Sequence, residues 1–283
     1  MAKKAPIDPL VRPYLKWAGG KRQLLPSIRA RLPQGWADMR YFEPFVGAGA
    51  VLFDLSPARA VVNDANSQLI LTYRAVRDDV EGVAALLEDH ARHHSREYYY
   101  ELRGADRTPG FARWGETRKA ARLIYLNKTC FNGLYRVNSQ GLFNVPFGSY
   151  RHPAICEEEV LRAVSRYLRE HDVQLLSGDF AAAVEGAGAG CFVYFDPPYH
   201  SEGGTNFTGY QSGGFGEQEQ IRLRDAFAAL SARGARCMLS NSATGFIQDL
   251  YRDFHVELIP ARRAINSDPA GRGNVNEVLV TNF

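Results

Sequence analysis

Apolar and polar positions change their spacing twice along the chain, which divides it into three stretches. In the first stretch, a short apolar run at Tyr41–Phe42 is followed by a glycine turn and by a helix predicted over 51–55. A second strand is predicted at Arg59–Asp64, and it ends in an acid. This order of strand, glycine turn, helix and acid-ended strand is typical of nucleotide-binding α/β sheets. We therefore expect the first stretch to form half of a doubly wound sheet.

The second stretch has helical spacing from about Leu71 to Leu168, with a segment over 132–148 that is rich in Gly, Asn and Pro. We expect a helical insertion that carries a structured loop. Strand character returns in the third stretch, together with a helix predicted over 217–232. The fold class is therefore predicted to be α/β, with a sheet that resumes after the insertion. The strands of the third stretch are predicted at Val173–Leu176, Cys191–Asp196, Arg236–Asn241, Val256–Ile259 and Val278–Thr281.

Composition narrows the class of protein. The chain has 283 residues, of which 45% are hydrophobic, and this is enough for a substantial core. No stretch approaches the roughly 18 apolar residues of a membrane helix, and the N-terminus lacks a signal-peptide pattern. We expect an unanchored cytoplasmic enzyme. The net charge of +3 is too small to identify a polyanionic partner by itself.

No metal site or disulfide framework is predicted. The four cysteines are widely spaced and form no Cys-x-x-Cys pair, so we expect buried, reduced thiols. His90 and His94 have the i, i+4 spacing that places two imidazoles on one helix face, but no third ligand lies nearby in the sequence. We expect a solvated helix face at these histidines.

The segment Asp196–Tyr199 carries the strongest chemical signal. Asp196 follows the apolar run Cys191–Phe195, so its carboxylate is expected at the carboxyl end of a buried strand, where open α/β sheets bind ligands. Pro197 and Pro198 lack N–H donors and present carbonyls. An exocyclic amine has two N–H donors, which Asp196 and the Pro197 carbonyl can accept, while the ring of Tyr199 stacks on the base. A rigid strand-ending turn is the alternative, and the glycine turn upstream favours catalysis.

The glycine turn indicates a nucleoside ligand without a pyrophosphate. Gly47 and Gly49 have the spacing of the first two glycines of the dinucleotide fingerprint, but Leu52 occupies the third position. Asp64 is suited to bind ribose hydroxyls. S-adenosylmethionine contains an adenosine and no phosphate, which agrees with both observations.

Cations and aromatic rings occur together in two places. Lys16–Lys21 is not a P-loop, because Leu15 and Arg22 stand where glycine and Ser/Thr are required. It suits a methionine carboxylate and a DNA phosphate, with a basic surface turn as the alternative. In the insertion, a similar mixture predicts a nucleic-acid surface, with a solvated charged face as the alternative. These residues are Arg118, Lys119, Arg122, Tyr125, Lys128, Phe131, Tyr135 and Arg136.

Collinear motifs over almost the whole chain resemble the Dam group of D12-class adenine-N6 DNA methyltransferases. The resemblance implies a class I S-adenosylmethionine-dependent methyltransferase sheet, Rossmann-like, with an inserted helical target-recognition domain. We place a cofactor-binding half at 1–72, the DNA target-recognition insertion at 73–170 and a catalytic half at 171–283. The main motifs are Lys16–Lys21, Glu43–Gly49, Asn132–Arg136, Phe143–Gly148 and Asp196–Tyr199, and supporting matches are Asn206–Tyr210, Leu239–Asn241, Arg263–Asn266 and Asn276–Leu279.

The resemblance also implies an activity and a set of site residues. The expected reaction transfers a methyl group from S-adenosylmethionine to N6 of an adenine that is flipped out of double-stranded DNA, in the sequence GATC. The flipped adenine is held by Asp196, Pro197, Pro198 and Tyr199. Cofactor contacts fall on Trp17, Lys21, Glu43, Phe45, Gly47, Gly49, Asp64, Asp179 and Asp196. DNA contacts fall on Lys16, Lys128, Phe131, Asn132, Leu134, Arg136, Asn144 and Pro146.

Two places depart from the better-known relative. Phe131 replaces a tyrosine that is thought to wedge into the opened duplex, and the segment 128–130 differs in the phosphate-contacting lead-in. The sequence leaves two kinds of alternative. Methyl transfer to cytosine N4, to RNA or to a protein glutamine would use the same chemistry. A catalytically idle DNA-binding module or a dinucleotide oxidoreductase would belong to a different class of protein. Asp196 and the collinear motifs disfavour the other methyl transfers. The intact segment Asp196–Tyr199 and the glycine turn disfavour the idle module, and Leu52 disfavours the oxidoreductase. We expect neither a metal nor an obligate protein partner. The enzyme is expected at the nucleoid. Whether it acts alone or together with a restriction nuclease stays open.

Overall fold

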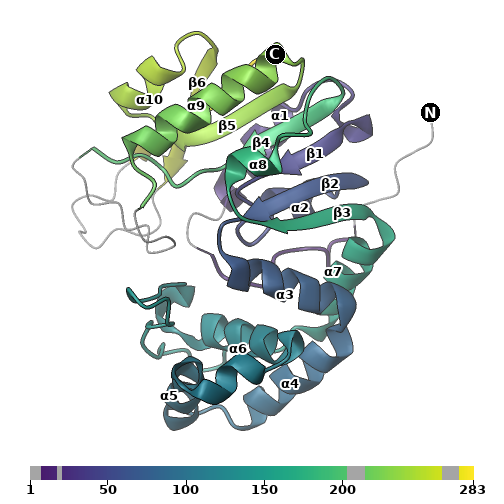
Figure 1. The fold of residues 1–283 in the computed structure, drawn as a ribbon, viewed down its shortest axis with the longest axis vertical. Helices are drawn as coiled ribbons and strands as arrows, with labels where there is room; N and C mark the ends of the chain where they lie inside the picture. The colour runs from purple at the N-terminus through teal and green to yellow at the C-terminus, as the bar shows by residue number, and fades with distance from the viewer. Residues whose placement is uncertain (1–7, 18–20, 203–213, 263–273) are drawn as a thin grey trace. The chain divides into compact units, whose positions relative to one another are not determined.

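The computed structural model describes residues 8–17, 21–202, 214–262 and 274–283 of the chain. Contacts within the chain define two compact units (Figure 1). The first unit consists of Met1–Gly20, Gly47–Ser56 and Asn66–Ser177, and the second consists of Lys21–Val46, Pro57–Ala65 and Gly178–Phe283. The glycines of the Lys16–Lys21 motif and the motifs Asn206–Tyr210 and Arg263–Asn266 lie outside the described residues.

Strands of the second unit form a mostly parallel sheet in the order β2-β1-β4-β5-β7-β6. The strand β1 is parallel to β2 and β4, and β4 is parallel to β5. The strand β7 runs antiparallel to both of its neighbours, β5 and β6. The bounds are β1 Arg40–Glu43, β2 Arg59–Asp64, β4 Cys191–Phe195, β5 Arg236–Ser242, β6 His255–Arg262 and β7 Asn274–Thr281.

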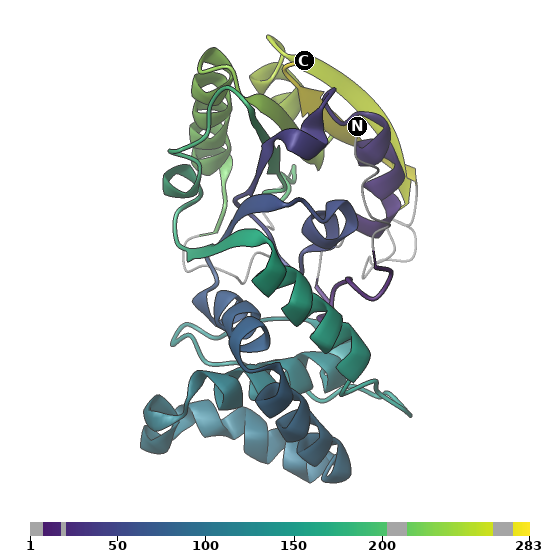
Figure 2. The ribbon, with the colours of Figure 1, turned by 90° about the vertical axis from the view of Figure 1, so that its right-hand side faces the viewer.

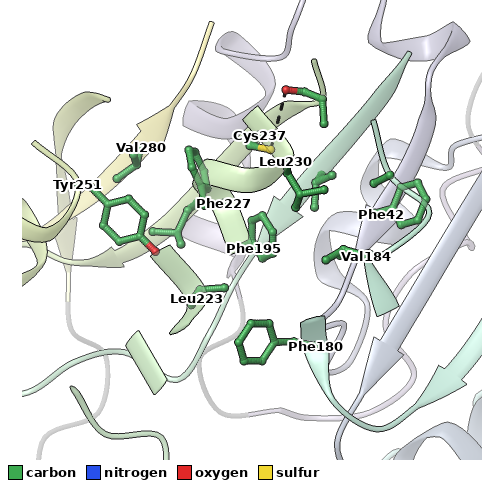
Figure 3. Packing of buried hydrophobic residues seen from close by; sticks show 14 of the residues in the cluster. Phe42, Phe180, Val184, Phe195, Leu223, Phe227, Leu230, Cys237, Tyr251 and Val280 are labelled. Carbon is green, nitrogen blue, oxygen red and sulfur yellow. Dashed lines mark hydrogen bonds between the residues drawn. The ribbon is translucent and has the colours of Figure 1, made fainter. Parts of the chain in front are cut away.

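The core of the second unit lies between this sheet and the helices α8, α9 and α10. Every residue of β4 is buried, which is why its sequence is apolar throughout rather than alternating. Figure 3 shows Phe195, Phe227 and Tyr251 together in this core, with the rings of Phe227 and Tyr251 5.6 Å apart. The strand that precedes Asp196 is therefore held rigidly. The helices of this unit are α1 Leu25–Ala30, α8 Phe180–Ala183, α9 Glu217–Ala232 and α10 Gly245–Leu250, with 3-10 turns at Lys21–Gln23 and Trp36–Asp38.

The first unit is mainly helical (Figure 2). Helix α6 is buried from Ala120 to Thr129 and packs against α3, α4 and α5. Asn66, Asp79 and Ser95 accept hydrogen bonds from the first N–H groups of α3, α4 and α5, so each of these helices begins at a capping side chain. The elements are α2 Ala50–Leu55, α3 Ser67–Asp78, α4 Val80–Arg92, α5 Arg96–Gly104, α6 Glu116–Thr129, α7 Glu158–Glu170 and β3 Asp172–Ser177, with 3-10 turns at Ala105–Arg107, Pro109–Arg113 and Phe131–Gly133.

The secondary structure follows the sequence prediction closely. The strand predicted at Arg59–Asp64 and the helix predicted over 217–232 are confirmed at both ends, and the helix predicted from Val51 begins one residue earlier. No helix within the described ranges is both long and apolar enough to cross a membrane.

The prediction of a solvated face at His90 and His94 is wrong. His90 is 6% exposed, its Nδ1 lies 2.7 Å from the hydroxyl of Tyr98, and its ring packs against Tyr125. His94 lies beyond the end of α4, and its Nδ1 is 2.9 Å from the hydroxyl of Tyr125. In both histidines, the imidazole Nδ1 therefore lies within hydrogen-bonding distance of a tyrosine hydroxyl. Within the described part of the chain, no group of three metal-ligating side chains is close enough to hold an ion.

Candidate active site and nucleic-acid interface

Polar side chains gather at the carboxyl edge of the parallel strands of the second unit. Glu43 ends β1, Asp64 ends β2, Asp196 follows β4 directly, and Ser240 lies near the end of β5. Because these four strands are neighbours and run in one direction, their carboxyl ends lie along one edge of the sheet. The sequence prediction for the position of Asp196 is confirmed in this respect.

Asp196 is a nearly enclosed carboxylate with two donors. Its side chain is 17% exposed, Lys21 Nζ lies 2.8 Å from its Oδ1, and the Ser240 hydroxyl donates to the same oxygen at 3.0 Å. The hydroxyl of Tyr194 lies 2.9 Å from Ser240 Oγ and completes a chain of hydroxyl groups. Burial raises the pKa of Asp196, while Lys21 and Ser240 act in the opposite direction. Both contacts converge on Oδ1, so Oδ2 is the oxygen left for an incoming donor.

The three residues after Asp196 are fixed by side chains of other elements. The Pro198 carbonyl accepts a hydrogen bond from Gln220 Nε2 at 2.9 Å, and the Tyr199 hydroxyl donates to Glu277 Oε2 at 2.9 Å. Lys21 Nζ also lies 4.2 Å from the centre of the Tyr199 ring. Among the described residues, no donor lies within hydrogen-bonding distance of the Pro197 carbonyl. Within the described part of the chain, the Pro198 carbonyl is thus hydrogen-bonded and the Pro197 carbonyl is not.

The remaining predicted cofactor residues of the second unit differ in their surroundings. Glu43 is buried and accepts from the Tyr41 hydroxyl at 2.8 Å, and Asp64 is half-buried. The ring of Phe45 packs against Phe180 at 5.2 Å. Asp179 caps α8 and pairs with Arg222 at 2.7 Å, and hydrogen bonding to Arg222 lowers its pKa. The acids fit a ligand that offers hydroxyl or amino groups rather than a phosphate.

Gly47 and Gly49 belong to the first unit, and packing of the protein itself requires both of them. They have φ of 50° and 75°, in the left-handed region. A Cβ on Gly49 would lie 2.7 Å from the Tyr73 hydroxyl and 2.8 Å from the Phe53 ring. A Cβ on Gly47 would lie 3.0 Å from the ring of Trp17, which stacks on Tyr135 at 5.5 Å. A larger residue at position 49 would therefore disturb the start of α2 before it met a ligand.

Lys16 is held close to Gly133 by Asn127, a buried side chain of α6. Asn127 Oδ1 accepts the backbone N–H of Lys16 at 2.8 Å, and its Nδ2 donates to the carbonyls of Lys16 at 2.7 Å and Gly133 at 3.0 Å. Lys16 Nζ donates to the Lys128 carbonyl at 3.2 Å and lies 3.6 Å above the ring of Tyr150. The structure thus brings together two segments that lie more than 100 residues apart in the sequence.

Six of the eight predicted DNA contacts, all except Lys16 and Lys128, lie on an irregular hairpin over 131–147. Phe131 N–H donates to the Pro146 carbonyl, and Asn144 N–H donates to the Arg136 carbonyl, so the two arms are paired. Asn132 has a φ of 54°, which is tolerated by asparagine. Arg136 is exposed, and its Nε donates to Asn144 Oδ1 at 2.8 Å. Of this set, Phe131, Asn132, Arg136 and Pro146 are exposed, while Leu134 and Asn144 are half-buried.

Other cations of the insertion lie inside it. Arg122 is 4% exposed and donates to the carbonyls of Leu102 and Arg103, and Tyr125 is fully buried. The prediction that these two residues lie on a nucleic-acid surface is wrong, because α6 is covered by neighbouring helices. Lys128 is also buried, and its Nζ pairs with Glu157.

Sequence reasoning missed the polar residues that hold the site in shape, namely Asn127, Gln220 and Ser240. Asn127 and Gln220 are amides on helices and resemble many surface residues in the sequence. Ser240 could have been found from the predicted strand Arg236–Asn241, because a polar residue near the end of a buried parallel strand faces the ligand-binding edge.

Comparison with known proteins shows the family of the chain. Residues 17–265 match the family described as D12 class N6 adenine-specific DNA methyltransferase. The chain is 44% identical over 274 residues to Type II methyltransferase M1.LlaDCHI of Lactococcus lactis subsp. cremoris, with 96% of each chain covered. It is 40% identical over 290 residues to Type II methyltransferase M.MjaIII of Methanocaldococcus jannaschii, with 96% of this chain and 99% of that protein covered. A DNA adenine methylase of Serratia marcescens is 34% identical over 274 residues, with 95% of this chain and 97% of that protein covered.

Proposed function

The chain belongs to the D12 class of N6 adenine-specific DNA methyltransferases, and from this premise we propose that it methylates adenine within GATC in duplex DNA, with S-adenosylmethionine as methyl donor and with the target base flipped out. The observation that carries the proposal is the pair of acceptors at the end of β4. Asp196 Oδ2 and the Pro197 carbonyl are adjacent along the chain, and the protein's own donors engage Asp196 Oδ1 and Pro198 instead.

We assign these two acceptors to the two hydrogens of adenine N6. Accepting both hydrogens orients the nitrogen lone pair and draws the amine toward tetrahedral, nucleophilic geometry. A neutral arylamine is too weak an acid for a carboxylate to deprotonate first, so the proton leaves N6 after methyl transfer. Asp196 is suited to accept it, because burial raises the pKa of its carboxyl group. Positioning and exclusion of water supply most of the catalysis, and no strong base is needed.

S-adenosylmethionine would supply the electrophilic sulfonium methyl group. We propose that Trp17, Lys21 and Phe45 line its pocket and that Glu43 and Asp64 accept hydrogen bonds from its hydroxyl and amino groups. Two observations support this assignment. Glu43 is a buried carboxylate at the end of β1, and Asp64 ends the neighbouring parallel strand. The remaining proposed positions are Gly47, Gly49, Asp179 and Asp196.

Adenine N6 cannot be reached for in-line attack inside a duplex, so base flipping at a cost of a few kcal/mol is part of the proposal. The face of Tyr199 would stack on the flipped base. Phe131 is 51% exposed at the start of the hairpin, and an exposed ring can fill the space that the base vacates. We retain 73–170 as the target-recognition domain between cofactor-binding (1–72) and catalytic (171–283) halves.

Base recognition is proposed for Lys16, Leu134, Arg136 and Pro146. Arg136 has the fork of donors that matches guanine O6 and N7 in the major groove. Its orientation by Asn144 supports this role, because a fixed guanidinium loses less side-chain entropy on binding.

Methyl transfer to defined duplexes tests the proposal. The purified chain would be incubated with tritiated S-adenosylmethionine and with duplexes that contain GATC, GATC already methylated on both strands, or each single-base variant of GATC. Incorporation into the first duplex alone, with N6-methyladenine as the product after nuclease digestion, is the expected result. Equal incorporation into the variants would reject GATC, and N4-methylcytosine as product, or transfer to RNA only, would reject the reaction.

A further inference from the structure

Two buried amides join the residues on either side of Tyr199. Gln220 of α9 and Asn241 of β5 are both fully buried. Gln220 Nε2 donates to the carbonyl of Pro198 at 2.9 Å, and Asn241 Oδ1 accepts the N–H of His200 at 3.0 Å. The two amides bond to each other, because Asn241 Nδ2 donates to Gln220 Oε1 at 3.0 Å. The peptide groups before and after Tyr199 are thus tied to one pair of side chains.

The backbone determines the orientation of both amides. Asn241 Oδ1 accepts from two N–H groups, those of His200 and Ser242, so its Nδ2 must face Gln220. Gln220 then presents its oxygen to Asn241 and its nitrogen to the Pro198 carbonyl. In the reverse orientation, Gln220 Nε2 would face Asn241 Nδ2, which is also a donor. Its Oε1 would face the Pro198 carbonyl, which is also an acceptor. No other arrangement satisfies all of these buried groups, and an unsatisfied buried amide is costly.

We propose that Gln220 is a positioning residue for methyl transfer, which fixes the Tyr199 ring and keeps the neighbouring Pro197 carbonyl directed at the substrate amine. The inference rests on the proposed function, since it concerns the same site. Three anchors define the position of Tyr199: Gln220 on the carbonyl before it, Asn241 on the N–H after it, and Glu277 on its own hydroxyl at 2.9 Å. Gln220 is the anchor adjacent to Pro197, so its loss frees the segment that carries the acceptor.

The test uses Gln220→Glu, which keeps the shape and the oxygen that faces Asn241 but replaces the donor to Pro198 by an oxygen. As a carboxylate this oxygen repels the carbonyl, and as a carboxylic acid it donates to it. We expect the single-turnover rate of methylation of a GATC duplex at neutral pH to fall about a hundredfold, because a small misplacement of reacting groups has an effect of this size. We also expect the ratio of the variant's rate to the wild-type rate to rise as pH falls. Gln218→Glu is the matched control, because Gln218 is exposed on the same helix.

Rates are to be expressed per S-adenosylmethionine-binding site, counted by calorimetry, so that a fraction of unfolded protein changes the number of sites and not the rate. Gln220→Met, which cannot donate at any pH, should be slow throughout the pH range. A near-normal rate in Gln220→Met, or a rate ratio for Gln220→Glu that does not change with pH, would overturn the proposal. Failure of the wild-type chain to methylate adenine would instead reject the underlying function, so the two outcomes are distinguishable.

Discussion

Lys21 Nζ lies 2.8 Å from Oδ1 of Asp196 and 4.2 Å from the centre of the Tyr199 ring, so one buried cation contacts both of these residues. Lys21 is 7% exposed and is therefore a fixed part of the site. Its charge favours the carboxylate form of Asp196 and opposes the rise that burial causes in the pKa of this residue.

Substitution of Asp196 tests the acceptor role. Asp196→Ala should lower the single-turnover rate by several orders of magnitude and leave duplex affinity nearly unchanged, because the lost interaction is made with the reacting amine. Rapid-quench methylation together with a binding titration measures both quantities. Asp225→Ala removes an exposed acid from α9 and serves as the control. A turnover near the wild-type value in Asp196→Ala would remove Asp196 from the mechanism.

Loss of Lys21 should move the pH profile in a defined direction. Burial raises the pKa of Asp196 and Lys21 opposes this rise, so Lys21→Met should raise that pKa further. The carboxylate is the active form, and the acid limb of the rate profile should therefore shift to higher pH, with the largest loss of rate at low pH. Single-turnover rates across the pH range measure the shift, and Arg252→Gln, at an exposed position, is the control. An acid limb at the wild-type position would show that another group controls it.

Substitution of Arg136 tests whether this residue recognises a base or contacts the phosphate backbone of DNA. Arg136→Ala should cost about 1–3 kcal/mol of discrimination at the guanine of GATC, whereas loss of a phosphate contact weakens all duplexes about equally. Asn144→Ala should weaken the same discrimination less, because it removes only the partner that orients Arg136. Rates on each single-base variant of GATC, at one fixed salt concentration, give the answer. A uniform decrease on every duplex would identify Arg136 as a backbone contact.

His90 should make the first unit sensitive to acid. Burial lowers the pKa of His90 to about 4, against roughly 6.5 for an unfolded chain. The folded state disfavours the charged form of the His90 imidazole. The free energy of unfolding is therefore highest above pH 6.5 and decreases as pH falls from 6.5 toward 4. The loss amounts to roughly 3 kcal/mol, at about 1.4 kcal/mol per pKa unit. Denaturant unfolding at several pH values should show this slope in the wild type and in the exposed control His152→Gln, and a flatter one in His90→Gln.

Alanine substitutions at two glycines with nearly the same φ distinguish the cost of the left-handed backbone conformation from the cost of steric contact with neighbouring side chains. Gly35 and Gly49 have φ of 74° and 75°, but a Cβ on Gly35 meets nothing within 4 Å, whereas on Gly49 it lies 2.7 Å from the Tyr73 hydroxyl. Gly35→Ala should therefore lose about 1–2 kcal/mol of unfolding free energy from the left-handed conformation alone. Gly49→Ala should lose clearly more and lower the melting temperature further. Equal losses would show that Tyr73 and Phe53 move aside without cost.

The sequence predicted elements and chemistry better than it predicted surroundings. The apolar run before Asp196 and the two prolines after it predicted a strand end, because a short apolar run that stops at prolines is typical of a fully buried parallel strand. The burial of Arg122 had no such signal, since its partners are the carbonyls of Leu102 and Arg103 and the carboxylate of Asp106. His90 was misjudged for the same reason, because Tyr98 and Tyr125 reach it from other helices. Spacing along a helix predicts which residues share a face, but not what covers that face.

The ion pair between Lys128 and Glu157 has a consequence for the salt dependence of DNA binding. A cation that neutralises a DNA phosphate releases a condensed counterion, and each such contact steepens the fall of log affinity with log salt by about 0.9. Lys128 already shares its charge with the carboxylate of Glu157, so in this state we expect it to displace no counterion from DNA. We therefore expect fewer ions to be released on DNA binding than the number of lysines and arginines in the insertion suggests.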